Sequence, residues 1–142
     1  MKRTLFVGLL IAIALTACAG STSADIQGQW RLVSYGSASD PSASLRTGLE
    51  PAAPGVETSI EFKDGTMTWN VGCNGFGWDY KVKGYKIEFG PVMSTMMYCE
   101  AIAEQEMGTL TVLQETTVFV LDGNTLTITS GDGNSVIVLE RK

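Results

Sequence analysis

The stretch TSIEFKDGTMTWNVGCNGFGWDYKVKGYKIEF, residues 58–89, decides the fold, because apolar and polar residues alternate along it between short turn sequences. The alternation predicts strands at residues 58–63, 67–71 and 76–82, with a hairpin turn at Asp64 and Gly65. A further turn at Lys83 and Gly84 leads into a fourth strand at residues 85–89. One face of these last two strands is expected to pack inward, and it carries Phe76, Trp78, Tyr80, Val82, Tyr85, Ile87 and Phe89. The stretch therefore predicts an antiparallel meander.

The flanking sequence adds further strands and one helix. Alternation around Trp30 predicts a first strand, and residues 117–121, 125–129 and 136–140 predict three more. Between residues 98 and 114 the period becomes helical, and Gly108 is expected to shorten or bend this helix. The face expected to pack inward holds Cys99, Ile102, Ala103, Met107, Leu110 and Leu113, with Glu100, Glu104 and Gln105 largely opposite. The predicted class is α+β: a small β-rich domain of about seven or eight antiparallel strands, with one helix inserted after the first group of strands.

The N-terminus reads as an export signal. Lys2 and Arg3 precede an apolar run of residues 5–15, which is too short to cross a bilayer as a helix, since that needs roughly 20 residues. The run ends in Leu15, Thr16, Ala17 and Cys18, which resembles the lipobox of bacterial lipoproteins. We predict a signal peptide at 1–17, an acyl chain on Cys18, a flexible tether at 18–25 and a folded domain at 26–142. An ordinary signal with a chance cysteine is the alternative.

The predicted subcellular location is the cell envelope, where the lipid would hold the protein on a membrane. Ala19, in place of an Asp after the lipidated cysteine, favours the outer membrane facing the periplasm if the source is Gram-negative. Within the domain, residues 36–57 carry three of the four prolines and are predicted to form one long flexible loop.

Composition narrows the classes of function. The 142 residues are enough for one domain, and a net charge of −5, which becomes −7 once Lys2 and Arg3 are removed, disfavours nucleic-acid binding. Histidine is absent, so the commonest general base and the commonest zinc ligand are missing. We find no catalytic centre in the sequence and expect no enzyme activity, no cofactor and no metal.

Two cysteines remain once Cys18 is assigned to lipid. In an oxidising compartment Cys73 and Cys99 are expected to pair, and the bridge would stabilise the fold by roughly 3.5 kcal/mol in the chain-entropy model. A redox or metal role would favour a Cys-x-x-Cys spacing, and the separation here is much wider.

Two motifs around these cysteines resemble the META domain, the family that includes HslJ-like heat-shock lipoproteins. The residues that carry the resemblance are Gly72, Cys73, Asn74 and Phe76, then Phe89, Gly90 and Pro91, and then Ser94, Thr95, Met96, Met97, Tyr98 and Cys99. It covers roughly residues 26–141. The resemblance implies a small β-rich envelope domain with a single helix, in a family linked to stress tolerance, some of whose members are similar in shape to secretin pilot proteins that bind lipid in a hydrophobic cavity. Family members commonly have a basic residue where Gly75 and Met96 stand.

Several other side chains are candidates for metal-binding, helix-capping or catalytic roles. Met93, Met96 and Met97 could supply thioether ligands to copper(I), although methionine more often fills gaps in a core, and a core role is the interpretation we favour. Asn74 is expected to satisfy a turn or backbone groups rather than to bind a ligand, and Thr95, or equally Ser94, is a candidate helix cap. The carboxylates of Glu61, Asp79 and Glu88 are expected on the solvated face.

The leading functional hypothesis is a monomeric, non-enzymatic envelope lipoprotein that binds a protein partner or an apolar ligand in stress tolerance. Trp69, Trp78, Tyr80 and Tyr85 would then either fill the core or line a cavity. An inhibitor of secreted proteases, presenting the 36–57 loop as a substrate-like segment, is the second hypothesis. A hydrolase without histidine is the third.

Overall fold

The computed structural model describes residues 23–37 and 48–142, so the predicted signal peptide and Cys18 lie outside the described residues. The first part of the chain contains α1 (Ser23–Ile26), β1 (Gly28–Ser37), β2 (Leu49–Pro51), β3 (Ser59–Lys63), β4 (Thr66–Asn70), β5 (Gly75–Lys83), β6 (Lys86–Phe89) and β7 (Met93–Ser94). The second part contains a 3₁₀ turn, η1 (Glu100–Ile102), then α2 (Ala103–Val112), β8 (Thr116–Asp122), β9 (Thr125–Thr129) and β10 (Ser135–Arg141).

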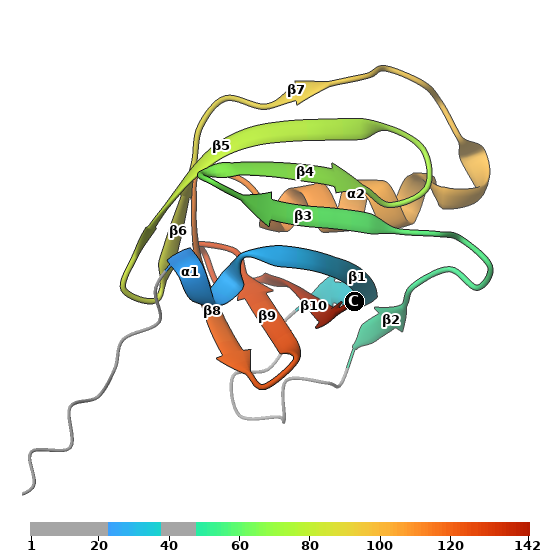
Figure 1. The fold of residues 1–142 in the computed structure, drawn as a ribbon. Coiled ribbons are helices and arrows are strands. Elements are labelled where there is room, and N and C mark those ends of the chain that lie inside the picture. Colours follow the sequence, from blue (N-terminus) through green and yellow to red (C-terminus); the bar gives the residue numbers. More distant parts are fainter. Residues whose placement is uncertain (1–22, 38–47) are drawn as a thin grey trace, which may run out of the picture.

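Eight of these strands form a closed antiparallel barrel in the order β1-β3-β4-β5-β6-β8-β9-β10 (Figure 1). β10 returns to pair with β1 from Trp30↔Arg141 to Ser37↔Ser135, and this pairing closes the barrel. The eight strands are the eight that alternation predicts, although the closure itself was not predicted. β2 and β7 are short additions, paired with β1 and β5.

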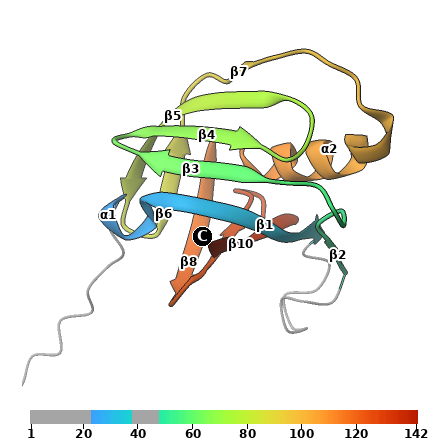
Figure 2. The same cartoon turned by 45° about the vertical axis from the view of Figure 1, so that its right-hand side comes forward.

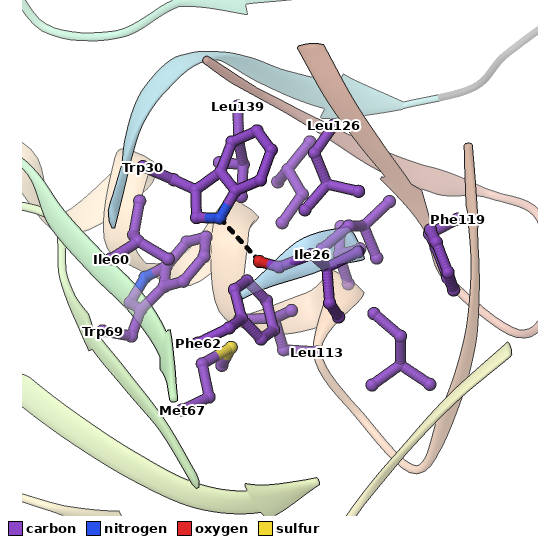
Figure 3. Close-up of a cluster of buried hydrophobic side chains, with 14 of the residues drawn as sticks. Ile26, Trp30, Ile60, Phe62, Met67, Trp69, Leu113, Phe119, Leu126 and Leu139 are labelled. Atoms are coloured by element: carbon purple, nitrogen blue, oxygen red, sulfur yellow. Dashed lines mark hydrogen bonds between the residues drawn. The ribbon is translucent and has the colours of Figure 1, made fainter. Parts of the chain in front are cut away.

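Buried side chains fill the barrel (Figure 3). Phe62 packs edge-on against Tyr80 with 5.2 Å between ring centroids, and Trp69 and Trp78 are buried beside them. Three of the four aromatic residues considered for a cavity therefore belong to the core, as small barrels require. The prediction for Tyr85 was wrong: it is exposed, because Lys83 pairs with Lys86 and leaves Tyr85 in the two-residue turn between β5 and β6.

The N-terminal helix α1 belongs to the domain. Ile26 is fully buried, lies among Phe62 and Leu113 in the core, and its carbonyl oxygen accepts a hydrogen bond from Trp30 Nε1 at 2.9 Å (Figure 3). The Arg141 guanidinium donates to the carbonyl oxygens of Gln27 and Asp25 at 2.7 and 2.8 Å. The predicted flexible tether at 18–25 is thus too long at its C-terminal end, because residues 23–25 are helical and bound to the barrel.

The predicted flexible loop at 36–57 also needs correction over the part that the structure describes. β2 pairs with β1 through Leu49↔Gly36, and Ala53 N–H donates to Gln105 Oε1 at 2.7 Å. Residues 48–57 are therefore attached both to the barrel and to α2, whereas residues 38–47 lie outside the described part.

Helix α2 packs against β1 and β10, on the opposite side of the barrel from α1 (Figures 1 and 2). Its buried face differs from the predicted one: Gln105 and Thr109 are buried and Met107 is exposed. Gln105 can be buried because its amide also donates to Val71 O at 2.7 Å, so both ends of the side chain have partners. Gly108 does not interrupt the helix. A Cβ there would lie 2.7 Å from Tyr35 Cδ2, so the glycine lets the Tyr35 ring pack on α2.

A search of the described residues for a helix that is long and apolar enough to span a membrane finds none.

Candidate functional site

Asn74, whose side chain is buried, lies at the centre of a partly buried polar cluster where the β4–β5 connection meets α2. Its backbone N–H and its Nδ2 each donate to the Glu106 carboxylate at 2.8 Å. Nδ2 also donates to Met97 O at 2.9 Å, and Oδ1 accepts from Met97 N–H at 2.8 Å. Asn74 thus satisfies backbone groups, the interpretation that the sequence favoured.

Thr95 belongs to the same cluster, and the helix-cap prediction for it was wrong. Its hydroxyl donates to Asn74 Oδ1 at 2.9 Å and accepts from Gly75 N–H at 3.1 Å, while its own N–H donates to Gly75 O. The residue that caps α2 is Ile102, which has no side-chain cap bond. The polar group of Thr95 is used to attach the chain to β5 instead.

A disulfide fixes the far end of this stretch. Cys73 and Cys99 are bonded, with 6.0 Å between their Cα atoms, which confirms the predicted disulfide. The chain from Thr95 to Cys99 is therefore attached at every second residue. Thr95 and Met97 form hydrogen bonds with Asn74, and Cys99 forms the disulfide.

The apolar side chains along and just before this stretch are exposed to solvent. We call residues 92–98 the methionine segment. It carries five exposed apolar residues, with exposed fractions of 53% for Val92, 75% for Met93, 96% for Met96, 60% for Met97 and 81% for Tyr98. The prediction that these methionines fill gaps in the core was wrong, because the polar cluster holds their backbone at the surface. Soluble domains rarely leave apolar side chains gathered in this way without a use for them.

A groove of about 520 Å³ lies beside the segment, on the outer face of β4, β5 and β7. At its centre three residues lie side by side on adjacent strands: Gly77 on β5 pairs with Thr68 on β4 and with Met93 on β7. A Cβ placed on Gly75 or Gly77 would meet no atom within 4 Å, so the groove is open because these two residues have no side chain. The lining is mostly apolar and also includes Ser59, Trp69, Asn70, Phe76, Ser94 and Thr95.

The remaining motif residues shape the same region. Gly72 has a φ of +119°, and a Cβ there would lie 2.4 Å from Val56 Cγ1 and 2.8 Å from Ile102 Cδ1. Phe76 stacks on Trp78 with 5.7 Å between ring centroids. Gly90 N–H donates to Asp79 O at 2.8 Å, and Pro91, which is exposed, leads from there into the methionine segment. The motif is therefore one structural unit that presents residues 92–98.

The carboxylates of the β-sheet do not assemble a reactive centre. Glu88 pairs with Lys83 on the surface, Asp79 is exposed, and Glu61 is half-buried on the outer face of β3. Over residues 23–37 and 48–142, no three His, Cys, Asp or Glu side chains come together in a way that could hold a metal ion. Burial raises the pKa of Tyr80, whose hydroxyl lies inside the barrel.

Sequence reasoning missed both the groove and the exposure of the segment. Gly75 and Gly77 alternate with aromatic residues on β5, and two glycines on the outward face of one strand were the available signal.

Comparisons with known proteins bear on the family and the fold. The family model described as META domain matches residues 24–142. A solved structure described as an NMR structure of the protein from Burkholderia xenovorans has a TM-score of 0.59 at 16% identity, covering 96% of this chain and 99% of that one. A second NMR structure has a TM-score of 0.60 at 15% identity, covering 84% of this chain and 94% of the other. No curated protein matches. At these identities the two structures indicate the fold alone.

Proposed function

This chain belongs to the META domain family, and from that premise we propose that it is a non-enzymatic lipoprotein of the cell envelope that binds a protein partner through the methionine segment and the groove beside it. The acyl chain on Cys18 would hold the barrel at a membrane, and the partner would contribute an apolar segment. Stress tolerance would follow from what the partner does when it is bound.

The observation that carries the proposal is the way in which the methionine segment is held. Its five exposed apolar side chains gain little from burial, so the hydrophobic effect does not account for their placement. Hydrogen bonds from Asn74 and the disulfide at Cys99 fix the backbone instead. A surface that is ordered before binding costs less conformational entropy when a partner docks. Exposed methionine is also well suited to an apolar partner, because its side chain adapts to irregular shapes.

A protein partner fits this surface better than a small apolar ligand. The interior of the barrel is occupied by side chains such as Trp30, Phe62 and Trp69, which leaves the outer groove as the apolar space beside the motif. That groove is shallow and open, whereas small-molecule sites usually enclose most of their ligand. β7 offers in addition a short strand whose pairing partner on one side is β5, and an extended segment of a partner could add to its other side.

Signal-peptide cleavage and lipidation are tested by intact mass spectrometry of the full-length protein purified from a bacterial envelope. The proposal expects loss of residues 1–17 and an added acyl mass on Cys18. An uncleaved chain, or a Cys18 without lipid, would overturn the lipoprotein part of the proposal.

Binding is tested by chemical crosslinking in intact cells, with wild type compared against Met96→Glu and Met107→Glu. Both methionines are exposed, but Met107 lies on α2 outside the methionine segment. We expect a discrete adduct in wild type that is strongly reduced by Met96→Glu, because a charge there must be desolvated on docking, and that is retained in Met107→Glu. No adduct in wild type, or equal loss in both variants, would count against the segment as the binding surface.

A further inference from the structure

The methionines of the described residues fall into two classes. Met67 is fully buried in the barrel, whereas Met93, Met96 and Met97 lie in the methionine segment and Met107 lies on α2. The exposed fractions of these four, from 60% to 96%, place their thioether sulfurs within reach of small solutes. The domain thus keeps a single methionine in its core and gathers three at the surface proposed for binding.

Peroxides oxidise exposed thioethers without breaking the polypeptide chain. One equivalent of hydrogen peroxide transfers one oxygen atom: an S–O bond forms, the peroxide O–O bond breaks, the sulfur loses two electrons, and the peroxide is reduced to water. The product, methionine sulfoxide, is polar and carries a hydrogen-bond acceptor. On an apolar docking surface this change acts directly on the groups that a partner would touch.

The anchoring of the segment makes this chemistry compatible with a folded domain. Asn74 bonds both backbone groups of Met97, and Thr95 attaches to Gly75, so none of the thioethers in the segment contributes to holding the chain in place. Sulfoxide formation at Met93, Met96 or Met97 leaves these bonds intact. The same change at Met67 would place a polar group in the core.

We propose that Met93, Met96 and Met97 are an oxidation site for peroxide-class oxidants, and that their conversion to sulfoxides releases the partner. This regulation rests on the proposed function, since it acts on the same surface. The change is reversible, because methionine sulfoxide reductases return both sulfoxide epimers to the thioether. Binding would therefore respond to the oxidant level of the compartment.

The first arm of the test needs no partner. The purified full-length protein is treated with hydrogen peroxide, and sulfoxide formation is followed at each methionine by peptide mass spectrometry. We expect Met93, Met96 and Met97 to oxidise at least about tenfold faster than Met67, because oxidation of the buried sulfur requires the barrel to open. Circular dichroism and the unfolding midpoint should stay close to those of the untreated protein. Equal rates at the four positions, or unfolding that accompanies oxidation of the segment, would overturn the proposal.

The second arm measures partner binding. Protein with a photo-crosslinking amino acid in place of Tyr98 is oxidised, or left untreated, and is mixed with a solubilised envelope fraction before irradiation. We expect the adduct to fall severalfold on oxidation and to return after treatment with the two sulfoxide reductases, and Met107→Leu should respond as the parent does. An adduct unchanged by full sulfoxidation would overturn the regulation. No adduct in the untreated protein would instead contradict the proposed function, and the oxidation rates of the first arm would still decide the modification site.

Discussion

The Arg141 guanidinium lies over the indole ring of Trp30, with 4.3 Å between its central carbon and the ring centroid. The same guanidinium donates to the carbonyl oxygens of Gln27 and Asp25, so one side chain near the C-terminus fastens α1 to the barrel. The planar guanidinium of arginine can stack on an aromatic ring and donate several hydrogen bonds in its plane, and the lysine ammonium group can do neither.

Arg141→Lys is therefore expected to destabilise the domain by about 1–2 kcal/mol, because the stacking and at least one hydrogen bond are lost. Denaturant unfolding followed by tryptophan fluorescence would measure the change. Arg31→Lys is the matched control, since Arg31 pairs with Glu140 on the exposed face of the sheet, and its effect should be within about 0.5 kcal/mol of zero. Equal effects of the two variants would show that Arg141 does not fasten α1.

Gly108→Ala is expected to destabilise α2, although alanine is the better helix former by about 1 kcal/mol. The new Cβ would lie 2.7 Å from Tyr35 Cδ2, so the ring or the helix must move, and overpacking of this kind costs about 1–3 kcal/mol. A double-mutant cycle with Tyr35→Ala checks the cause. In that background Gly108→Ala should become neutral or stabilising, and an unchanged cost would mean that Tyr35 is not the obstacle.

Asn74→Ala is expected to cost about 2–4 kcal/mol and to release the methionine segment, because both backbone groups of Met97 lose their partner and the Glu106 carboxylate loses its bond from Asn74 Nδ2. Hydrogen exchange measured by mass spectrometry should show faster exchange at residues 93–98, with β9 and β10 little changed. Thr95→Val is the milder comparison, since it removes the bond of one hydroxyl to the same cluster. Exchange that rises uniformly over the barrel would argue against a local role for Asn74.

The hydrogen-bonded carboxylate of Asp132 is expected to make the free energy of unfolding of the domain depend on pH at the acid end. The Ser130 hydroxyl, followed by the backbone and side-chain amides of Asn134, donates to the carboxylate and holds the pKa of Asp132 below its ordinary value. The pKa of Asp132 is thus lower in the folded state than in the unfolded state, where it is about 3.9. The ionised carboxylate therefore stabilises the folded state above that pH, and this stabilisation is lost as the pH falls through the lower pKa of the folded state. Melting temperatures between about pH 2 and pH 6 should therefore fall less steeply at the acid end for Asp132→Asn than for wild type. Identical slopes would refute the assignment.

The barrel strands could be predicted from the sequence because alternation is a local signal. Trp30, Phe62, Trp78 and Ile128 each occupy an inward position that their immediate neighbours already indicate. Closure could not be predicted in the same way, since the pairing of Trp30 with Arg141 joins the first and last strands of the barrel, and neither strand's own sequence indicates its partner. The disulfide was predictable because an exported chain with two cysteines outside the signal region is expected to pair them.

The buried face of α2 and the exposure of the methionine segment were missed for a common physical reason. Apolarity was taken as a measure of burial, but Gln105 is buried because backbone groups of Ala53 and Val71 satisfy its amide. Met96 and Met107 are exposed although they are apolar. Exposure of apolar side chains runs against the burial tendency that governs folding, so alternation and apolarity alone could not predict it.

The most direct test of the central claim is a position scan with a photo-crosslinking amino acid in living cells. Met93, Met96 and Tyr98 would be replaced one at a time, with Tyr85 and Val120 as controls of comparable exposure outside the methionine segment. The account predicts one common adduct from the segment positions that is absent from the controls and that falls when Gly77→Leu fills the groove without straining the backbone. Adducts of equal yield at all five positions, or an adduct indifferent to Gly77→Leu, would contradict it.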